Sequence, residues 1–324
     1  MHPQIITEQV VRESISFDEA SIAAIEKAFA SLASGSAIVM PPVMQINVDG
    51  VQGQTCVKSA YTPGDAFFVV KLASTFHQNH KLDVPNASGL MLVCNSQTGH
   101  VECILLDNGY LTALRTQAAG AVAAKHLSRW NSKSAALIGA GRQARLQLVA
   151  LLAVRPIERA VVWSPNAEEC EAFASDMRES LGIDVRSSVS AEAAVRGADI
   201  IVTATPARTP VVKAEWLSQG QHITAMGADA PGKSELWPET LLKATLYACD
   251  REQQCRSLSE LHAAIEAGVV PADFPAAEIG DIVSGVRTGR RSDADITIAD
   301  LTGLGVQDTA IALLAWSKIR NNAV

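Results

Sequence analysis

The chain has 324 residues and a formal net charge of −7 at pH 7, with 27 Lys and Arg against 34 Asp and Glu. Hydrophobic residues make up 48% of it and charged residues 19%, which is typical of a globular protein with a large core. At about 150 residues per domain, this length indicates two domains. The acidic balance and a sequence pI near 5.5 argue against nucleic acid or an anionic membrane as the main partner.

Several features of the chain point to a cytoplasmic protein. The amino-terminal segment lacks the basic start and apolar run of a secretory signal, and no apolar stretch reaches the roughly 18 residues of a membrane span. The six cysteines contain no Cys-x-x-Cys pair, so reduced, mostly buried thiols are expected. The histidines, including His77 and His80, are not grouped with cysteines or acids, and we expect no metal site.

The first 115 residues combine an amphipathic helix with several strands. The helix is marked by apolar residues at three- and four-residue spacing, namely Ile22, Ile25, Phe29 and Leu32. Strands are predicted where apolar runs are separated by turn-forming residues, over 54–60, 66–73 and 89–94.

From about residue 120 onwards, short apolar runs alternate with helical patterns. Strands are predicted over 135–138, 160–163, 183–186, 199–205, 222–226, 245–249 and 296–300. Helices are predicted over 142–154, 167–181, 191–196, 237–243 and from Gln307 to about Ile319. Parallel strands covered on both faces by crossover helices have this alternation.

We therefore predict an α/β fold in which a Rossmann-type, doubly wound parallel sheet is inserted in a smaller α+β domain. The expected boundaries are 119–306 for the nucleotide-binding domain, and 1–118 with 307–324 for a domain that binds substrate and forms the dimer.

Gly139, Gly141 and Ala144 form a Gly-x-Gly-x-x-Ala motif between a predicted strand and a predicted helix. Gly139 would permit a tight turn, Gly141 the close approach of a pyrophosphate, and Ala144 close helix–strand packing. The free N–H groups at the helix start would bind phosphates. A glycine-bearing surface turn is the alternative, but this setting favours a dinucleotide site. The other loop residues expected to contact the cofactor are Ala140, Arg142 and Gln143.

The second strand of the predicted sheet decides between NAD and NADP. An acid about 20 residues beyond the glycines would bind the ribose hydroxyl of NAD. Here the strand is followed by Ser164, Pro165 and Asn166, without an acid. Arg142 could meet a 2′-phosphate or be a solvent-exposed residue at the helix start. The sequence therefore leans towards NADP and leaves NAD open, with Ser164 and Asn166 as expected contacts.

Four segments together resemble the ornithine cyclodeaminase/mu-crystallin family. They are residues 106–119, 138–144, 226–236 and 301–308. Within the family, the chain most resembles the ectoine-utilisation proteins, over Pro41-Pro42 and residues 56–64, 105–112, 300–303 and 307–312. The chain departs from them at 232–236, which is closer to cyclodeaminase and alanine dehydrogenase members. It also has Met44-Gln45 where many members have an arginine.

The resemblance implies NAD(P)-dependent chemistry at the Cα of an amino acid or its imine, in a homodimer built through the non-Rossmann domain. It implies three catalytic residues: Lys71 beside the substrate carboxylate and imine, Arg115 holding the carboxylate, and Asp229 as acid–base group. The further contacts it implies are Arg115, Thr116, Thr205, Met226 and Gly227 for the cofactor, and Lys58 and Gly303 for the substrate.

The chemistry explains why these residue types suit the reaction. A forked guanidinium such as Arg115 fixes a planar carboxylate, and a protonated imine needs a nearby acid such as Asp229. Each residue also has a structural interpretation: Lys71 as a surface lysine at a strand end, Asp229 as a turn residue, and Asp107 and Asp308 as caps or loop anchors.

The leading functional prediction is an NAD(P)H-dependent reductase of an α-imino acid, with a role in ectoine or hydroxyectoine breakdown implied by the resemblance. The first alternative is a cyclodeaminase, which releases ammonia from ornithine or a related diamino acid while its NAD is recycled. The second is an NADPH-dependent protein that binds a small ligand without turnover.

Overall fold

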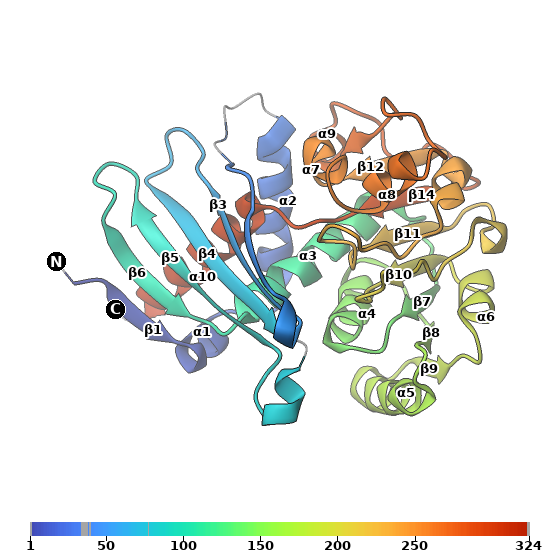
Figure 1. Cartoon of the computed structure of the whole chain (residues 1–324), viewed down its shortest axis with the longest axis horizontal. Coiled ribbons are helices and arrows are strands. Elements are labelled where there is room, and N and C mark those ends of the chain that lie inside the picture. Colours follow the sequence, from blue (N-terminus) through green and yellow to red (C-terminus); the bar gives the residue numbers. More distant parts are fainter. Residues whose placement is uncertain (1, 34–37, 39, 77, 323–324) are drawn as a thin grey trace. The chain divides into compact units, whose positions relative to one another are not determined.

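The computed structural model describes residues 2–33, 38, 40–76 and 78–322. The chain divides into two compact units: unit 1 comprises Met1–Ala118 and Leu304–Val324, and unit 2 comprises Ala119–Gly303. Residues 304–306 thus belong with unit 1, whereas the sequence had placed them in the nucleotide-binding domain. We describe the two units separately (Figure 1).

Unit 1 is a single sheet with helices on one face. Its strands are β1 (Gln4–Thr7), β2 (Met44–Val48), β3 (Gly53–Ala60), β4 (Phe67–Phe76), β5 (Ala87–Asn95) and β6 (Val101–Leu106). Its helices are α1 (Glu8–Ser14), α2 (Glu19–Ala33), α10 (Gly305–Asn322) and the first part of α3 (Tyr110–Leu127). The strand order is β1-β6-β5-β4-β3-β2, antiparallel except for the parallel pair β1–β6.

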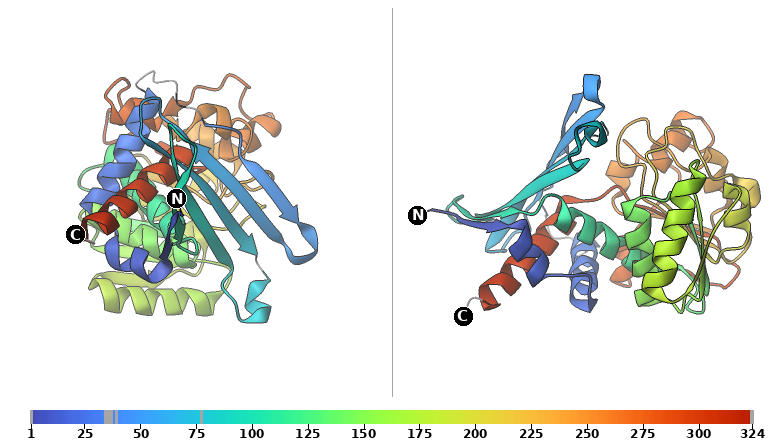
Figure 2. Two further views of the ribbon diagram at one scale, coloured as in Figure 1. Left: turned by 90° about the vertical axis from the view of Figure 1, so that its left-hand side faces the viewer. Right: turned by 90° about the horizontal axis from the view of Figure 1, so that it is seen from below.

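The two faces of this sheet differ in what covers them. Helix α10 packs on β3, β4 and β5, and α2 packs on α10. The right-hand view of Figure 2 shows these helices on one side of the strands. Because side chains alternate along a strand, Lys71 on β4 and Asp308 on α10 can meet on this helix-covered face, whereas Leu72 points to the opposite face.

Unit 2 is the doubly wound domain. Its strands are β7 (Ser134–Ile138), β8 (Arg159–Trp163), β9 (Asp184–Ser187), β10 (Ile200–Thr203), β11 (His222–Ala225), β12 (Leu246–Cys249), β13 (Ala277–Glu278) and β14 (Thr297–Asp300). Its α-helices are α4 (Arg142–Val154), α5 (Ala167–Leu181), α6 (Ala191–Arg196), α7 (Glu252–Cys255), α8 (Glu260–Glu266) and α9 (Ile279–Val283). Figure 1 shows α4 and α6 on opposite sides of the β7–β8 region.

The sheet of unit 2 is parallel throughout, in the order β13-β12-β14-β11-β10-β7-β8-β9. Every residue of β7, β10, β11 and β14 is buried, as expected when both faces of a sheet are covered. The strand order reverses at β7, and ligands of such sheets bind beyond the carboxyl ends of the strands at this switch point. The predicted α/β class is confirmed.

Sequence periodicity located most elements of unit 2 to within a residue or two, but α7, α8, β13 and α9 were not predicted. One difference is the segment 237–243, which forms a 3₁₀ helix over Pro238–Lys243 rather than an α-helix. Pro238 stands at its first position and has no N–H group, which suits a short helix start. Among the described residues, no helix is long and apolar enough to cross a membrane.

Candidate functional site

A buried ion-pair cluster lies under the sheet of unit 1. Lys71 is in the middle of β4 and only 3% exposed, and Asp308, in the first turn of α10, is 1% exposed. Lys71 Nζ lies 2.7 Å from Asp308 Oδ2, and Arg115 Nε on α3 lies 3.1 Å from Asp308 Oδ1. One carboxylate therefore joins two of the three residues that were predicted to be catalytic.

Gln307, next to Asp308, fixes the arginine from a second direction. Arg115 Nη1 donates to Gln307 Oε1 over 3.2 Å, and the backbone N–H of Leu304 donates to the same oxygen over 3.1 Å. Gln307 is fully buried, and its Nε2 has no hydrogen-bond partner in the described part of the chain. Within that part of the chain, a buried amide donor without an acceptor thus lies beside Arg115.

The cluster carries an excess of positive charge. Lys58 is the register neighbour of Lys71 on β3, and Lys71, Arg115 and Lys58 all act on the carboxylate of Asp308. The buried carboxyl group of Asp107 also interacts with Lys71. Burial lowers the pKa of Lys71 to about 8, and Arg115 and Lys58 act in the same direction while Asp308 opposes them. Burial acts to raise the pKa of Asp308, but the neighbouring cations outweigh it and leave that pKa below its usual value. The cluster is therefore suited to attract an anion.

Asp107 precedes α3, and Thr116 lies within it. Asp107 Oδ2 accepts the backbone N–H of Leu111 over 2.8 Å, which is the capping role considered for it. Burial raises the pKa of Asp107 to about 6, although its hydrogen bonds and the charge of Lys71 oppose that shift. Thr116 Oγ1 donates to the carbonyl of Thr112 within the helix.

In unit 2, the glycine motif joins β7 to α4. Gly139 has φ +113°, and a Cβ there would lie 2.7 Å from the carbonyl oxygen of Ala204. A Cβ at Gly141 would meet nothing within 4 Å. Gly141 is also the N-cap of α4, and no side chain caps that helix, unlike α5, which Asn166 caps. Uncapped N–H groups facing open space fit the phosphates of a dinucleotide.

Apart from Arg115 and Thr116, which lie in unit 1, the remaining predicted cofactor residues lie at the carboxyl edge of this sheet. Ser164 follows β8, where its hydroxyl donates to the carbonyl of Asn166, and no acid stands between them. Thr205 follows β10, and Met226 and Gly227 follow β11. Arg142 and Gln143 open α4, and Ala140 and Ala144 complete the loop; Ala144 is fully buried.

Asp229 and Gly303 lie in unit 2 and not in the cluster of unit 1. Asp229 follows β11 with its side chain 52% exposed, and its Oδ1 lies 2.7 Å from Lys233 Nζ. Gly303 has φ +79°, and its N–H donates to Asp250 Oδ2 over 2.7 Å. The predicted catalytic role of Asp229 therefore stays a prediction.

Sequence reasoning missed Gln307 and Glu235 and considered Asp308 only as a cap or anchor. A signal for Asp308 existed, because a lysine within an apolar strand such as β4 needs a buried carboxylate partner. Glu235 was visible only as part of a family segment. It is fully buried and binds the loops that follow β10 and β11. In the described ranges no group of three or more His, Cys, Asp or Glu could hold a metal ion; His77 lies outside them.

These two assemblies, a cationic cluster and a dinucleotide loop, can be compared with known proteins. The family model "Ornithine cyclodeaminase/mu-crystallin family" matches residues 1–323. The chain belongs to this family. The recognition of the family from sequence is thereby confirmed at that level.

Three similar proteins illustrate the range of the family. An uncharacterised cyclodeaminase of Sinorhizobium fredii is 46% identical over 315 residues, which cover 97% of this chain and 95% of that protein. The structure of Thermococcus litoralis Δ1-pyrroline-2-carboxylate reductase with NADH and L-proline is 33% identical, with a TM-score of 0.93 over 99% of this chain and 98% of that one. An archaeal alanine dehydrogenase dimer with bound NAD is 35% identical, with a TM-score of 0.92 over 100% and 98% of the two chains.

These relatives include nicotinamide-dependent enzymes of amino and imino acids as well as a protein named a cyclodeaminase. Both solved structures are complexes with NADH or NAD. These relatives therefore bind a nicotinamide dinucleotide, the type of cofactor that the glycine motif predicts.

Proposed function

We propose that this protein is an NAD(P)H-dependent reductase that converts an α-imino acid into the amino acid. The Lys71–Asp308–Arg115 cluster is the observation that carries the proposal, because two buried cations there share one directly paired carboxylate, where a substrate carboxylate would bind. The reductase and dehydrogenase among the relatives support it.

Arg115 is proposed to hold the substrate carboxylate. In the described part of the chain, its Nε faces Asp308 and its Nη1 donates to Gln307, which leaves Nη2 for a carboxylate oxygen. Asp308 and Gln307 would thus fix the plane of the guanidinium before substrate arrives. Such preorganisation keeps the reacting carbon in place for hydride transfer.

Lys71 is proposed to bind the same carboxylate or the imine nitrogen as a point charge. Its pKa of about 8 lets it exchange a proton near neutral pH, whereas an exposed lysine would not. When bound, the reduced nicotinamide supplies the hydride that the imine carbon accepts. Asp229 is proposed to hold or deliver the proton at nitrogen; its position after β11 and its exposed carboxylate support this.

The test is the oxidation of NADH and NADPH by the purified protein with a panel of imines. The panel contains five- and six-membered cyclic imino acids, iminosuccinate, and α-keto acids mixed with ammonia or methylamine. We expect net loss of reduced cofactor with at least one of them, and an Arg115→Lys variant with a raised KM for that imine. No loss with any of them would refute the reductase.

A cyclodeaminase is the second candidate, and the 46% identity to the Sinorhizobium fredii protein favours it. It would release ammonia from ornithine, lysine or diaminobutyrate without net change in NAD. Ammonia release with constant absorbance at the nicotinamide band would select this candidate. Affinity for a ligand without either reaction would select the third, a binding protein without turnover.

For the cofactor we propose NADP(H) as the better substrate. The absence of an acid between Ser164 and Asn166 and the exposed Arg142 support this preference, although the solved relatives named above contain NADH and NAD. The ratio of kcat/KM for NADPH to that for NADH tests it. A value below one would overturn the preference.

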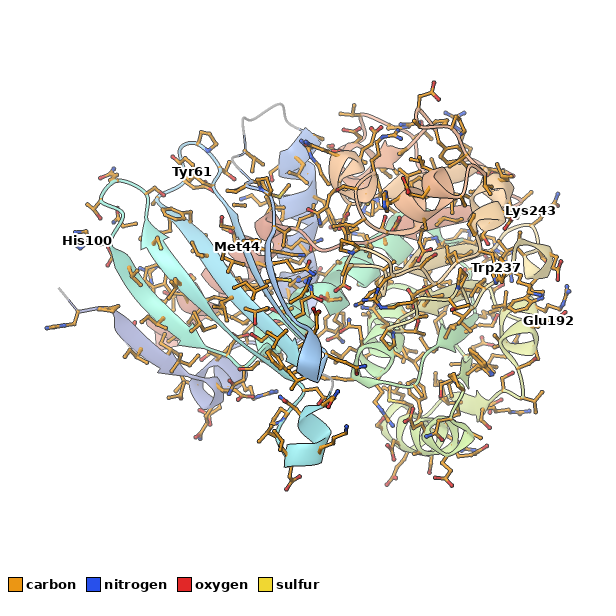
Figure 3. All side chains as sticks on the ribbon, viewed as in Figure 1. Met44, Tyr61, His100, Glu192, Trp237 and Lys243 are labelled. Carbon is orange, nitrogen blue, oxygen red and sulfur yellow. The ribbon has the colours of Figure 1, made fainter. Side chains whose placement is uncertain are left out.

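We also propose that the protein is a homodimer formed through unit 1. The face of its sheet opposite α10 carries the apolar row Met44, Val57, Leu72 and Leu90, one residue from each of four adjacent strands. Met44 is 55% exposed and Leu72 38%. This face is turned towards the viewer in Figure 3, where Met44 is labelled. An exposed apolar sheet face is typical of a contact surface, and the alanine dehydrogenase relative is a dimer.

Two further expectations stay predictions. A cytoplasmic location is supported by the six cysteines, all of which are free thiols. A role in ectoine or hydroxyectoine breakdown is supported by the resemblance over 56–64 and 105–112, while the relatives named above carry other names.

A further inference from the structure

Glu235 connects two loops at the carboxyl edge of the unit 2 sheet. Its Oε1 accepts the N–H and the hydroxyl of Thr205, over 2.6 and 2.8 Å. Its Oε2 accepts the hydroxyl of Thr203 and the N–H of Gly227, both over 2.7 Å. Thr203 ends β10 and Thr205 follows it, whereas Gly227 follows β11. One side chain therefore fixes both loops.

The four donors match a carboxylate and no neutral side chain of the same shape. Each oxygen of Glu235 accepts one backbone N–H, and an N–H cannot turn away as a hydroxyl can. In a Glu235→Gln variant the amide NH₂ must replace one oxygen. Whichever way the amide is turned, the N–H of Thr205 or of Gly227 loses its acceptor.

The packing leaves little freedom around this carboxylate. A Cβ at Gly227 would lie 2.5 Å from Glu235 Cδ and 2.2 Å from the carbonyl oxygen of Thr205. Glu260 holds the backbone at Glu235: its carboxylate oxygens accept the backbone N–H groups of Glu235 and Leu236 over 2.8 and 3.0 Å. Both glutamates are buried.

The position of these loops gives the carboxylate a function. β10 lies beside β7, whose glycine loop fits the pyrophosphate, and a Cβ at Gly139 would meet the carbonyl of Ala204 in the β10 loop. In a doubly wound sheet the adenosine half of the cofactor extends over the β8 side of the switch point, so the nicotinamide half extends over β10 and β11.

We propose that Glu235 is a positioning residue that fixes the loops after β10 and β11 for the nicotinamide half of the cofactor. The proposal rests on the NAD(P)H-dependent function proposed above. It makes no claim of contact between Glu235 and the substrate.

Asp199 offers a matched control at the opposite edge of the same sheet. It precedes β10, and its Oδ2 accepts the backbone N–H groups of Lys133 and Ser134 over 2.8 and 3.0 Å and the hydroxyl of Ser134 over 2.9 Å. It is also paired with Arg129. Asp199→Asn therefore makes the same acid-to-amide change at a side chain that also accepts two backbone N–H groups, although this side chain is 22% exposed. It lies at the amino ends of β10 and β7, away from the predicted cofactor edge.

The experiment compares full-length wild type, Glu235→Gln and Asp199→Asn. We measure thermal unfolding, the Kd for NADH by fluorescence, kcat and KM for the imine, and amide hydrogen exchange without cofactor. For Glu235→Gln we expect faster exchange in 203–207 and 226–230, a Kd raised about fivefold or more, and kcat lowered about tenfold or more, with KM for the imine nearly unchanged. For Asp199→Asn we expect a lower unfolding temperature with unchanged Kd and kcat.

The proposal is overturned if Glu235→Gln leaves both loop exchange and NADH affinity unchanged, or if Asp199→Asn produces the same losses. If Glu235→Gln does not fold, Thr203→Val removes one donor only and should raise the Kd and loop exchange in the same direction; no change there would also overturn it. Failure of the proposed function gives a different result: the wild-type protein binds NADH but does not oxidise it with any imine. The Kd and exchange measurements then still decide the role of Glu235.

Discussion

Asp308→Asn is the most informative single substitution, because it removes the carboxylate that pairs directly with both buried cations, Lys71 and Arg115. The new amide is of similar size, so the change is electrostatic rather than steric. We expect a folded protein of clearly lower stability, with a raised KM for the imino acid because both cations lose their fixed positions.

The magnitude follows from the burial of Lys71. The difference between its ordinary pKa of 10.5 and its value of about 8 corresponds to about 3 kcal/mol, even with Asp308 in place. Removing one partner of a buried pair costs about 3–5 kcal/mol. We expect a loss in this range at pH 7. Asp18→Asn is the control, since Asp18 pairs with Lys318 at 2.8 Å but both side chains are partly exposed, and its loss should stay under about 1 kcal/mol.

The pH dependence gives an independent check. The folded chain releases the Lys71 proton above about pH 8, while the unfolded chain keeps it until near 10.5. The unfolded state binds more protons in this window, so the contribution of Lys71 to wild-type stability rises with pH across it. Above about pH 8, Lys71 is neutral in the folded wild type and no longer gains from Asp308. The deficit of Asp308→Asn should therefore shrink there.

The assay is urea unfolding of both variants and wild type between pH 6 and pH 10, followed by circular dichroism. A Lys71→Met/Asp308→Asn double variant should be more stable than Asp308→Asn alone, because it no longer buries the unpaired ammonium. The reasoning fails if Asp308→Asn loses no more stability than Asp18→Asn, or if its deficit does not change with pH.

Four further outcomes are expected. Gly141→Val should weaken NADH binding about tenfold or more, measured by fluorescence, and should cost little stability because the new side chain enters open space. Gly139→Ala should instead destabilise the fold, since φ is +113° and the new Cβ would lie 2.7 Å from the carbonyl oxygen of Ala204. Unchanged NADH affinity in Gly141→Val would contradict the phosphate assignment. Arg115→Lys should raise KM for the imino acid about tenfold or more and leave the Kd for NADH unchanged, as judged by steady-state kinetics; an unchanged KM would remove Arg115 from the substrate site. Leu72→Asp should convert a dimer into a monomer in light scattering, whereas a dimeric variant would place the interface elsewhere.

The sequence predicted the doubly wound unit well because its signals are local. Helix α5 begins and ends where expected: Asn166 accepts the N–H groups of Glu168 and Glu169, and Gly182 closes the helix at φ +68°. The buried strands are short apolar runs between such helices. β1, β2 and β6 of unit 1 were not predicted. β1 and β2 carry exposed apolar residues on sheet edges that give no clear alternation of buried and exposed positions.

The candidate site could be predicted only in part, because its contacts join residues that are far apart in the sequence. Lys71 and Arg115 were identified through family segments, but nothing local indicates that Asp308 lies between them, because the contact depends on α10 returning under β4. Gly305 allows that return: a Cβ there would lie 2.3 Å from the carbonyl oxygen of Ser59. Contacts between segments so far apart in the chain leave no periodic pattern in the sequence.

The measurement that tests the central claim most directly is the transfer of deuterium from 4-deuterated NADH or NADPH, of both stereochemistries, to the product formed from the reactive imine. The account predicts an amino acid with one deuterium at Cα and an equal amount of oxidised cofactor. Ammonia release from a diamino acid with no net oxidised cofactor, and no labelled amino acid from any imine, would contradict it.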